Sequence, residues 1–233
     1  MTSSIDSTSP LPTLATYVIL HHQVKRQVPA IIVPLDLQNS RLFADWDSDV
    51  WELLRKLEWY RRPFVQDLLY RQKTGPEKTF LLLTRLTDFS RLLSECTGQS
   101  TSLSPNPLLT QIQAALTVEI TEGGPTVIYN IETAPWNKLG AEQRFISLPA
   151  AALFFFAAER HLATGLAEKK FILSHPTQDG VTFYQEKLQL NLLWSRGPDR
   201  YAVVERESLL QALLLYRENI EHIRKTLPRY EPG

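Results

Sequence analysis

The chain has 233 residues, of which 43% are hydrophobic and 21% charged, and this ordinary globular usage excludes wholesale disorder. Its 25 basic and 25 acidic residues give a formal net charge of zero. Strong non-specific attraction to nucleic acid or to an anionic lipid surface is therefore not expected.

The cysteine count and the N-terminus bear on the compartment. A single cysteine, Cys96, excludes an intrachain disulfide and is typical of a reducing compartment. Residues 1–13 are rich in Ser, Thr and Pro, which predicts a disordered tail. They contain no Lys or Arg, so neither a signal peptide nor a transit peptide is expected, because both need basic residues. The most apolar run, 150–158, is too short to cross a bilayer. We expect a cytoplasmic protein without membrane insertion.

Residues 14–98 are interpreted as an α-rich N-terminal region that begins with two short strands. The prolines at the ends of the second strand favour an edge position for it, since proline cannot donate to the ladder. Apolar residues at helical spacing predict helices after the strands. The predicted strands cover 16–22 and 28–35, and the predicted helices cover 47–62, 64–74 and 80–96. Residues 99–106 are polar and without periodicity, which predicts a linker.

Residues 107–228 are interpreted as a C-terminal α+β domain. A short helix over 107–116 is predicted first, from the Asn106–Pro107 start. Alternation of apolar and polar residues around Gly123–Gly124–Pro125 then predicts a hairpin. The remaining predicted strands cover 143–148, 170–174, 181–185, 188–194 and 201–204. The remaining predicted helices begin at Pro149 and at a capping box formed by Ser208 and Gln211.

Strands and helices do not alternate strictly, so the pattern favours α+β over a doubly wound parallel sheet. We expect a helical N-terminal part and a mostly antiparallel sheet packed by two helices.

Motifs that announce a cofactor or a metal are missing from the sequence. The five histidines are scattered, and no HExxH or paired-cysteine motif occurs. Neither a phosphate-binding glycine loop nor a G-x-S-x-G nucleophile elbow is found. We therefore expect no metal and no cofactor.

The leading hypothesis is a non-catalytic protein-binding factor (an adaptor, assembly or regulatory protein) that binds another protein or a second copy of itself. It depends on two helical surfaces, one aromatic and basic, the other an apolar seam. The first contains Trp51, Arg55, Trp59, Arg61 and Arg62, and the second contains Leu209, Leu213, Tyr216, Ile220 and Ile223. The seam could instead pack on its own sheet.

Two alternatives stay open. The order of elements in the second half is similar to that of Whirly-like single-strand binders, which implies single-stranded nucleic-acid binding on a sheet face. The residues expected there are Tyr129, Lys170, Phe183, Tyr184 and Trp194. The other alternative is an enzyme with a site in the cleft between the two halves, for which His161, His175 and Cys96 are the candidates.

Overall fold

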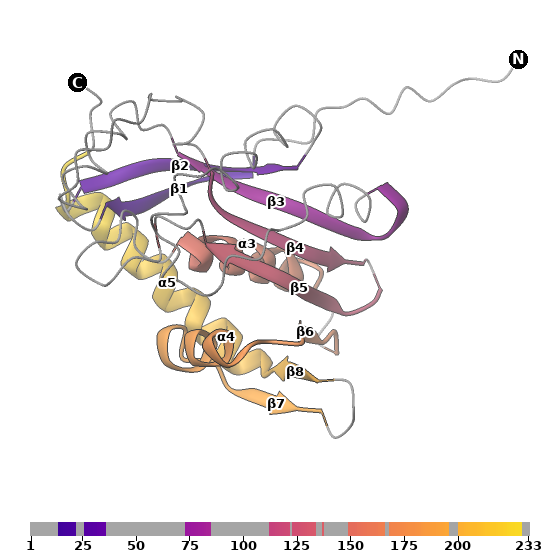
Figure 1. The fold of residues 1–233 in the computed structure, drawn as a ribbon. Helices are drawn as coiled ribbons and strands as arrows, with labels where there is room; N and C mark the ends of the chain where they lie inside the picture. Colours follow the sequence, from indigo (N-terminus) through magenta and orange to yellow (C-terminus); the bar gives the residue numbers. More distant parts are fainter. Residues whose placement is uncertain are drawn as a thin grey trace, which may run out of the picture.

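The computed structural model describes residues 14–21, 26–35, 73–84, 112–121, 123–133, 137, 149–165, 168–195 and 200–229. Within these residues the strands form one eight-stranded sheet in the order β1-β2-β3-β4-β5-β6-β8-β7 (Figure 1). The strands are β1 (Leu14–His21), β2 (Arg26–Pro34), β3 (Glu77–Thr84), β4 (Ile112–Ile120), β5 (Thr126–Thr133), β6 (Phe171–Ser174), β7 (Leu192–Trp194) and β8 (Tyr201–Val204). The helices are α3 (Pro149–Ala163), α4 (Gln178–Thr182), the π-helical turn η4 (Phe183–Lys187) and α5 (Arg206–Thr226).

The sheet is mixed. Strands β1 to β5 pair antiparallel in chain order, and β8 pairs antiparallel with both β6 and β7. Strand β6 lies parallel to β5, with α3 as the crossover between them. The predicted α+β class is confirmed, with one parallel step in a largely antiparallel sheet. A helical N-terminal part is not confirmed, because residues 47–72, which hold nearly all of the helices predicted there, lie outside the described residues.

The predicted helix over 80–96 is wrong at its start, where β3 (Glu77–Thr84) forms instead. Leu81 and Leu82 are neighbours in β3 that point to opposite faces of the sheet, and both are 0% exposed. A strand covered on both faces has a continuous apolar run, which periodicity alone does not distinguish from a buried helix. Residues 85–96 lie outside the described part of the chain.

Strand β2 is not at the edge of the sheet as predicted. It lies between β1 and β3, with Pro29 opposite Val18 and Pro34 opposite Phe80. Pro34 is the last residue of the strand, where one missing donor disturbs the ladder little.

Three further predictions in the second half are corrected. Residues 112–116 belong to β4, not to a helix, and residues 188–191 precede β7, which begins only at Leu192. Ser208 is not the N-cap of the last helix: Glu205 is, and the Ser208 hydroxyl donates to its carbonyl at 3.0 Å. The hairpin around 123–125 is confirmed as β4 and β5.

The predicted strand over 181–185 is helical. Thr177 is the N-cap of α4, and its Oγ1 accepts a hydrogen bond from the Gly180 N–H at 3.1 Å. The Asp179–Gly180 pair therefore lies in the first turn of a helix. An Asp-Gly pair is also typical of hairpin turns, but here Thr177 caps the Gly180 N–H and a helix begins.

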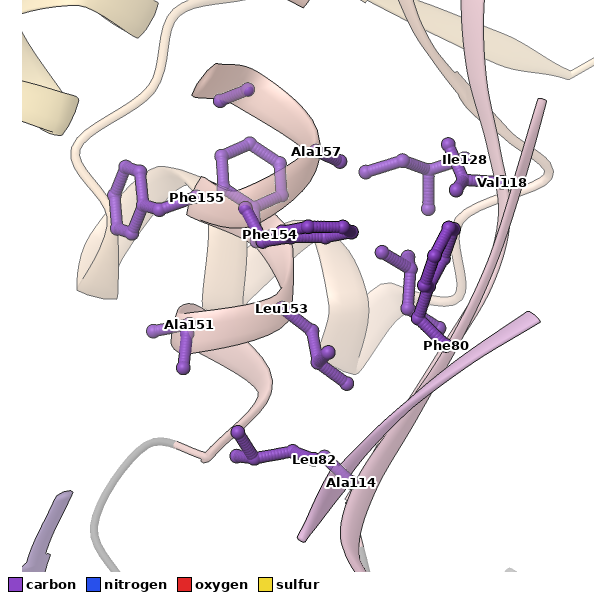
Figure 2. Packing of buried hydrophobic residues seen from close by; sticks show 14 of the residues in the cluster. Phe80, Leu82, Ala114, Val118, Ile128, Ala151, Leu153, Phe154, Phe155 and Ala157 are labelled. Atoms are coloured by element: carbon purple, nitrogen blue, oxygen red, sulfur yellow. The ribbon is translucent and has the colours of Figure 1, made fainter. Parts of the chain in front are cut away.

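Helix α3 lies at the centre of the core, which is why it is apolar on all sides. Figure 2 shows Leu153 and Phe154 directed from α3 toward the sheet and Phe155 on the opposite side of the helix. Phe154 contacts Phe171 of β6 at 5.5 Å between ring centroids, and Phe155 stacks on Tyr216 of α5 at 4.4 Å. Helix α3 thus connects the sheet to α5. In the described residues, no helix is long and apolar enough to span a membrane.

Candidate functional site

The parallel pair β5 and β6 separates after three residue pairs. The ladder runs from Thr126 opposite Phe171 to Ile128 opposite Leu173, after which β5 continues to Thr133 while β6 ends at Ser174. A cavity of about 90 Å³ lies where the two strands diverge. Its walls come from β5, from the end of β6, and from α4 and η4: Ile128, Tyr129, Asn130, Ile131, Leu173, Ser174, His175, Pro176, Thr177, Gly180 and Tyr184.

A β-bulge in β5 lies at the same place. Thr117 of β4 pairs with Asn130 and Val118 pairs with Ile128, so Tyr129 is an extra residue in β5. Bulges bend a strand and re-aim its side chains, and they occur often beside active sites. The Tyr129 hydroxyl donates to Oε2 of Glu119 at 2.8 Å. The bulge therefore marks the point at which β5 turns away from β6.

Tyr184, from η4, forms the buried wall of the cavity. Its side chain is 4% exposed, and its ring lies 5.6 Å from that of Phe154. Burial raises the pKa of the Tyr184 phenol, because a phenolate would be poorly solvated there. A phenol held protonated in this way can donate a hydrogen bond.

His175 lies at the exposed side of the cavity, directly after β6. Its backbone has a φ of 47°, in the left-handed region that few non-glycine residues adopt. The His175 N–H donates to the carbonyl of Arg200 at 2.8 Å. The imidazole Nδ1 lies 2.9 Å from the Ser174 Oγ. Both the backbone and the ring of His175 are therefore held in place.

No group of three or more potential metal ligands occurs among the described residues. The site is built from hydroxyl, imidazole and backbone groups. These groups can donate and accept hydrogen bonds.

The structure places the predicted partner-binding residues differently. Trp51, Arg55, Trp59, Arg61 and Arg62 lie outside the described residues. On α5, Leu209 is 0% exposed and Leu213 is 5% exposed, Tyr216 stacks on Phe155, and Ile220 and Ile223 are half-buried. For Leu209, Leu213 and Tyr216 the second interpretation holds: this part of the helix packs on its own core.

The residues predicted to stack bases do not share one open sheet face. In η4, Tyr184 is buried and Phe183 is half-buried. Lys170 is exposed and directly precedes β6. Trp194, in β7, has the Arg200 guanidinium over its ring. Tyr129 and Tyr184 instead face one cavity.

The three candidates for an enzyme site are also separated. His161 is buried in α3, His175 lines the cavity, and Cys96 lies outside the described residues.

Sequence reasoning did not single out Ser174, Thr177 and Asn130, which line the cavity. A signal for the location was present: a strand, a helix and a strand over 126–174 indicate a parallel pair with a crossover, and ligands bind at the carboxyl ends of such strands.

No family model matches the chain, and no curated protein matches it. Solved structures with a similar arrangement include apo FdhC, described as a nucleotide-linked sugar GNAT, at a TM-score of 0.49 and 9% identity, covering 88% of this chain and 96% of that one. AtaTR bound with AcCoA aligns at a TM-score of 0.45 and 12% identity, over 80% and 98% of the two chains. An acetyltransferase from Streptococcus agalactiae aligns at 0.41 and 9%, over 75% and 96%.

The prediction of a non-catalytic adaptor, assembly or regulatory factor is corrected by these findings. The similar solved structures are described as a nucleotide-linked sugar GNAT, as bound with AcCoA and as an acetyltransferase, not as binding factors. The described part of the seam on which that prediction depended has its central leucines in the core. Nucleic-acid binding and a cleft between two halves fit the structure no better.

Proposed function

We propose that this chain is an acyltransferase that binds a thioester donor of the acetyl-CoA type between β5 and β6. The observation that carries the proposal is the cavity at the divergence of a parallel strand pair, bounded by the Tyr129 bulge and the Tyr184 phenol. The words that describe the similar structures name such a donor, but at TM-scores below 0.5 they carry no weight of their own.

The shape of the site suits an extended chain that contains amide groups. The β5–β6 ladder ends at Ile128, and the next residues of β5 that line the cavity include Asn130 and Ile131. An extended ligand can continue a ladder that stops, because its amides replace those of a strand. The pantetheine arm of coenzyme A has this form, and its thioester end would lie in the cavity.

The buried phenol supplies the chemistry that acyl transfer needs. When a nucleophile attacks the thioester carbonyl carbon, the carbon–sulfur bond breaks and negative charge develops on sulfur. A protonated donor placed in a dry site stabilises such charge. The raised pKa keeps the Tyr184 hydroxyl protonated throughout the neutral range, so it can donate to the sulfur.

Calorimetric titration of the full chain with acetyl-CoA tests donor binding directly. Hydrogen–deuterium exchange with and without acetyl-CoA then tests the location. We expect slower exchange of amides in 129–131 and 175–180, where the ligand would cover the backbone, and unchanged exchange in α5. NAD, which has adenine and phosphates but no pantetheine arm, is the matched ligand control.

Absence of heat and of protection with acetyl-CoA would overturn the proposal. Protection by NAD equal to that by acetyl-CoA would also overturn it, because the pantetheine arm would then contribute nothing.

A further inference from the structure

We infer that His175 is the base that accepts the proton of the acyl acceptor, and that Ser174 orients it. The inference rests on the proposed acyl transfer and adds the second half of the reaction. It begins from the backbone of His175, which has the left-handed φ of 47° at the edge of the cavity.

The conformation of His175 is not explained by the end of a helix. The other described non-glycine residue with positive φ is Gln189, at 55°, and it follows Leu188, the C-cap of η4. A left-handed residue at that position is routine. His175 instead follows a strand and precedes Pro176, and glycine or asparagine would adopt its φ at lower cost. A strained residue with a chemically active side chain at a cavity is a candidate for function.

Two contacts hold the backbone and the imidazole ring of His175. The N–H bond to the Arg200 carbonyl, at 2.8 Å, attaches the backbone to the start of β8. The 2.9 Å contact between Nδ1 and the Ser174 Oγ fixes the plane of the ring. With Nδ1–H donating to Oγ, the other ring nitrogen, Nε2, keeps its lone pair and can accept a proton.

His175 and Tyr184 then divide the reaction between two walls of one cavity. The acceptor, an amine or a hydroxyl, forms a bond to the carbonyl carbon and loses its proton to Nε2 of His175. The carbon–sulfur bond breaks, its electron pair goes to sulfur, and Tyr184 donates a hydrogen bond to the leaving thiolate. The imidazolium returns its proton to the thiolate or to water, which completes the balance.

Substitution can remove the imidazole of His175 without changing the backbone conformation. His175→Asn and His175→Gly both tolerate positive φ, and the glycine variant also leaves space for free imidazole. Gln189→Gly is the matched control, since it alters the other left-handed residue, which does not line the cavity. The assay follows thiol release from acetyl-CoA with water alone and with benzylamine, and calorimetry measures coenzyme A binding.

We expect both His175 variants to bind coenzyme A like the wild type and to release thiol about 100-fold or more slowly. Free imidazole should restore part of the rate in His175→Gly and little in His175→Asn. Gln189→Gly should keep the wild-type rate. Ser174→Ala should lower the rate less than either variant, because it leaves the imidazole present.

Several results would overturn the inference: unchanged rates in both His175 variants, loss of coenzyme A binding together with the rate, or no rescue by imidazole. A wild type that binds coenzyme A but releases no thiol with either acceptor would overturn the assignment of His175 and leave the donor site standing. A wild type that does not bind coenzyme A would overturn the proposed function, and this inference with it.

Discussion

The side-chain amide of Gln27, in β2, donates a hydrogen bond to the backbone carbonyl of Leu227, the residue that caps the C-terminal end of α5. The same side-chain amide donates to the Arg224 carbonyl at 3.2 Å, and the backbone N–H of Gln27 donates to the Pro228 carbonyl. Gln27 is 5% exposed. One buried side chain near the start of the sheet thus satisfies carbonyl groups that the end of the last helix leaves without intrahelical partners.

Replacing Gln27 by alanine should lower the free energy of unfolding by about 0.5–1.5 kcal/mol, because the carbonyls of Arg224 and Leu227 would lose their donor. Urea denaturation measures this difference. Gln211→Ala, at an exposed position of the same helix, should change stability by less than about 0.5 kcal/mol. Equal effects of the two variants would show that the cap contributes nothing.

His161 should make the protein less stable as the pH falls from about 6.5 to 4. Burial, followed by the charges of Lys169 and Arg206, lowers the pKa of this imidazole to about 4. Over that interval the unfolded chain takes up a proton that the folded chain does not, so the free energy of unfolding decreases as the pH falls. The loss should reach up to about 3 kcal/mol. Above pH 6.5 this residue should contribute no pH dependence.

The measurement is the free energy of unfolding against pH for the wild type and His161→Gln. The variant should show a flatter profile between pH 6.5 and 4. His222→Gln, at an exposed histidine of α5, should keep the wild-type slope. A variant profile parallel to that of the wild type would contradict the expected role of His161.

Two adjacent leucines of α5 allow the stability contribution of a core side chain to be compared with that of a surface side chain. Leu213 is 5% exposed and Leu214 is 58% exposed. Leu213→Ala should cost about 2–5 kcal/mol by leaving a cavity in the core, whereas Leu214→Ala should cost less than about 0.5 kcal/mol. Thermal or urea denaturation compares the pair. A large loss at Leu214 would mean that its side chain is covered in solution.

Tyr184→Phe should keep donor binding and slow thiol release from acetyl-CoA by about 10²-fold or more, because the ring stays in place while the proton donor is removed. Gln185→Ala, at an exposed position in the same helical turn, is the control and should keep the wild-type rate. If Tyr184→Phe turned over acetyl-CoA as fast as the control, the hydroxyl would have no part in the reaction.

Local pattern was sufficient wherever neighbouring residues determine the structure. The glycine-rich turn at 123–125 joins two alternating segments, and they form the β4–β5 hairpin. Apolar spacing placed α3 and α5 close to their observed bounds. Local pattern failed for β3, where a run buried on both faces resembles a helix, and for 181–185, where a Thr177 cap begins a helix.

By itself, the sequence determined the α+β class, the central hairpin and the two long helices, because turns, caps and apolar periodicity act within a few residues. Only the tertiary structure decided the parallel pairing of β5 with β6, the bulge at Tyr129 and the cavity that joins Tyr129, His175 and Tyr184. The physical reason is that a site between strands depends on which distant segments pair and on where their ladder stops. Both are set by packing around α3, which no local pattern encodes.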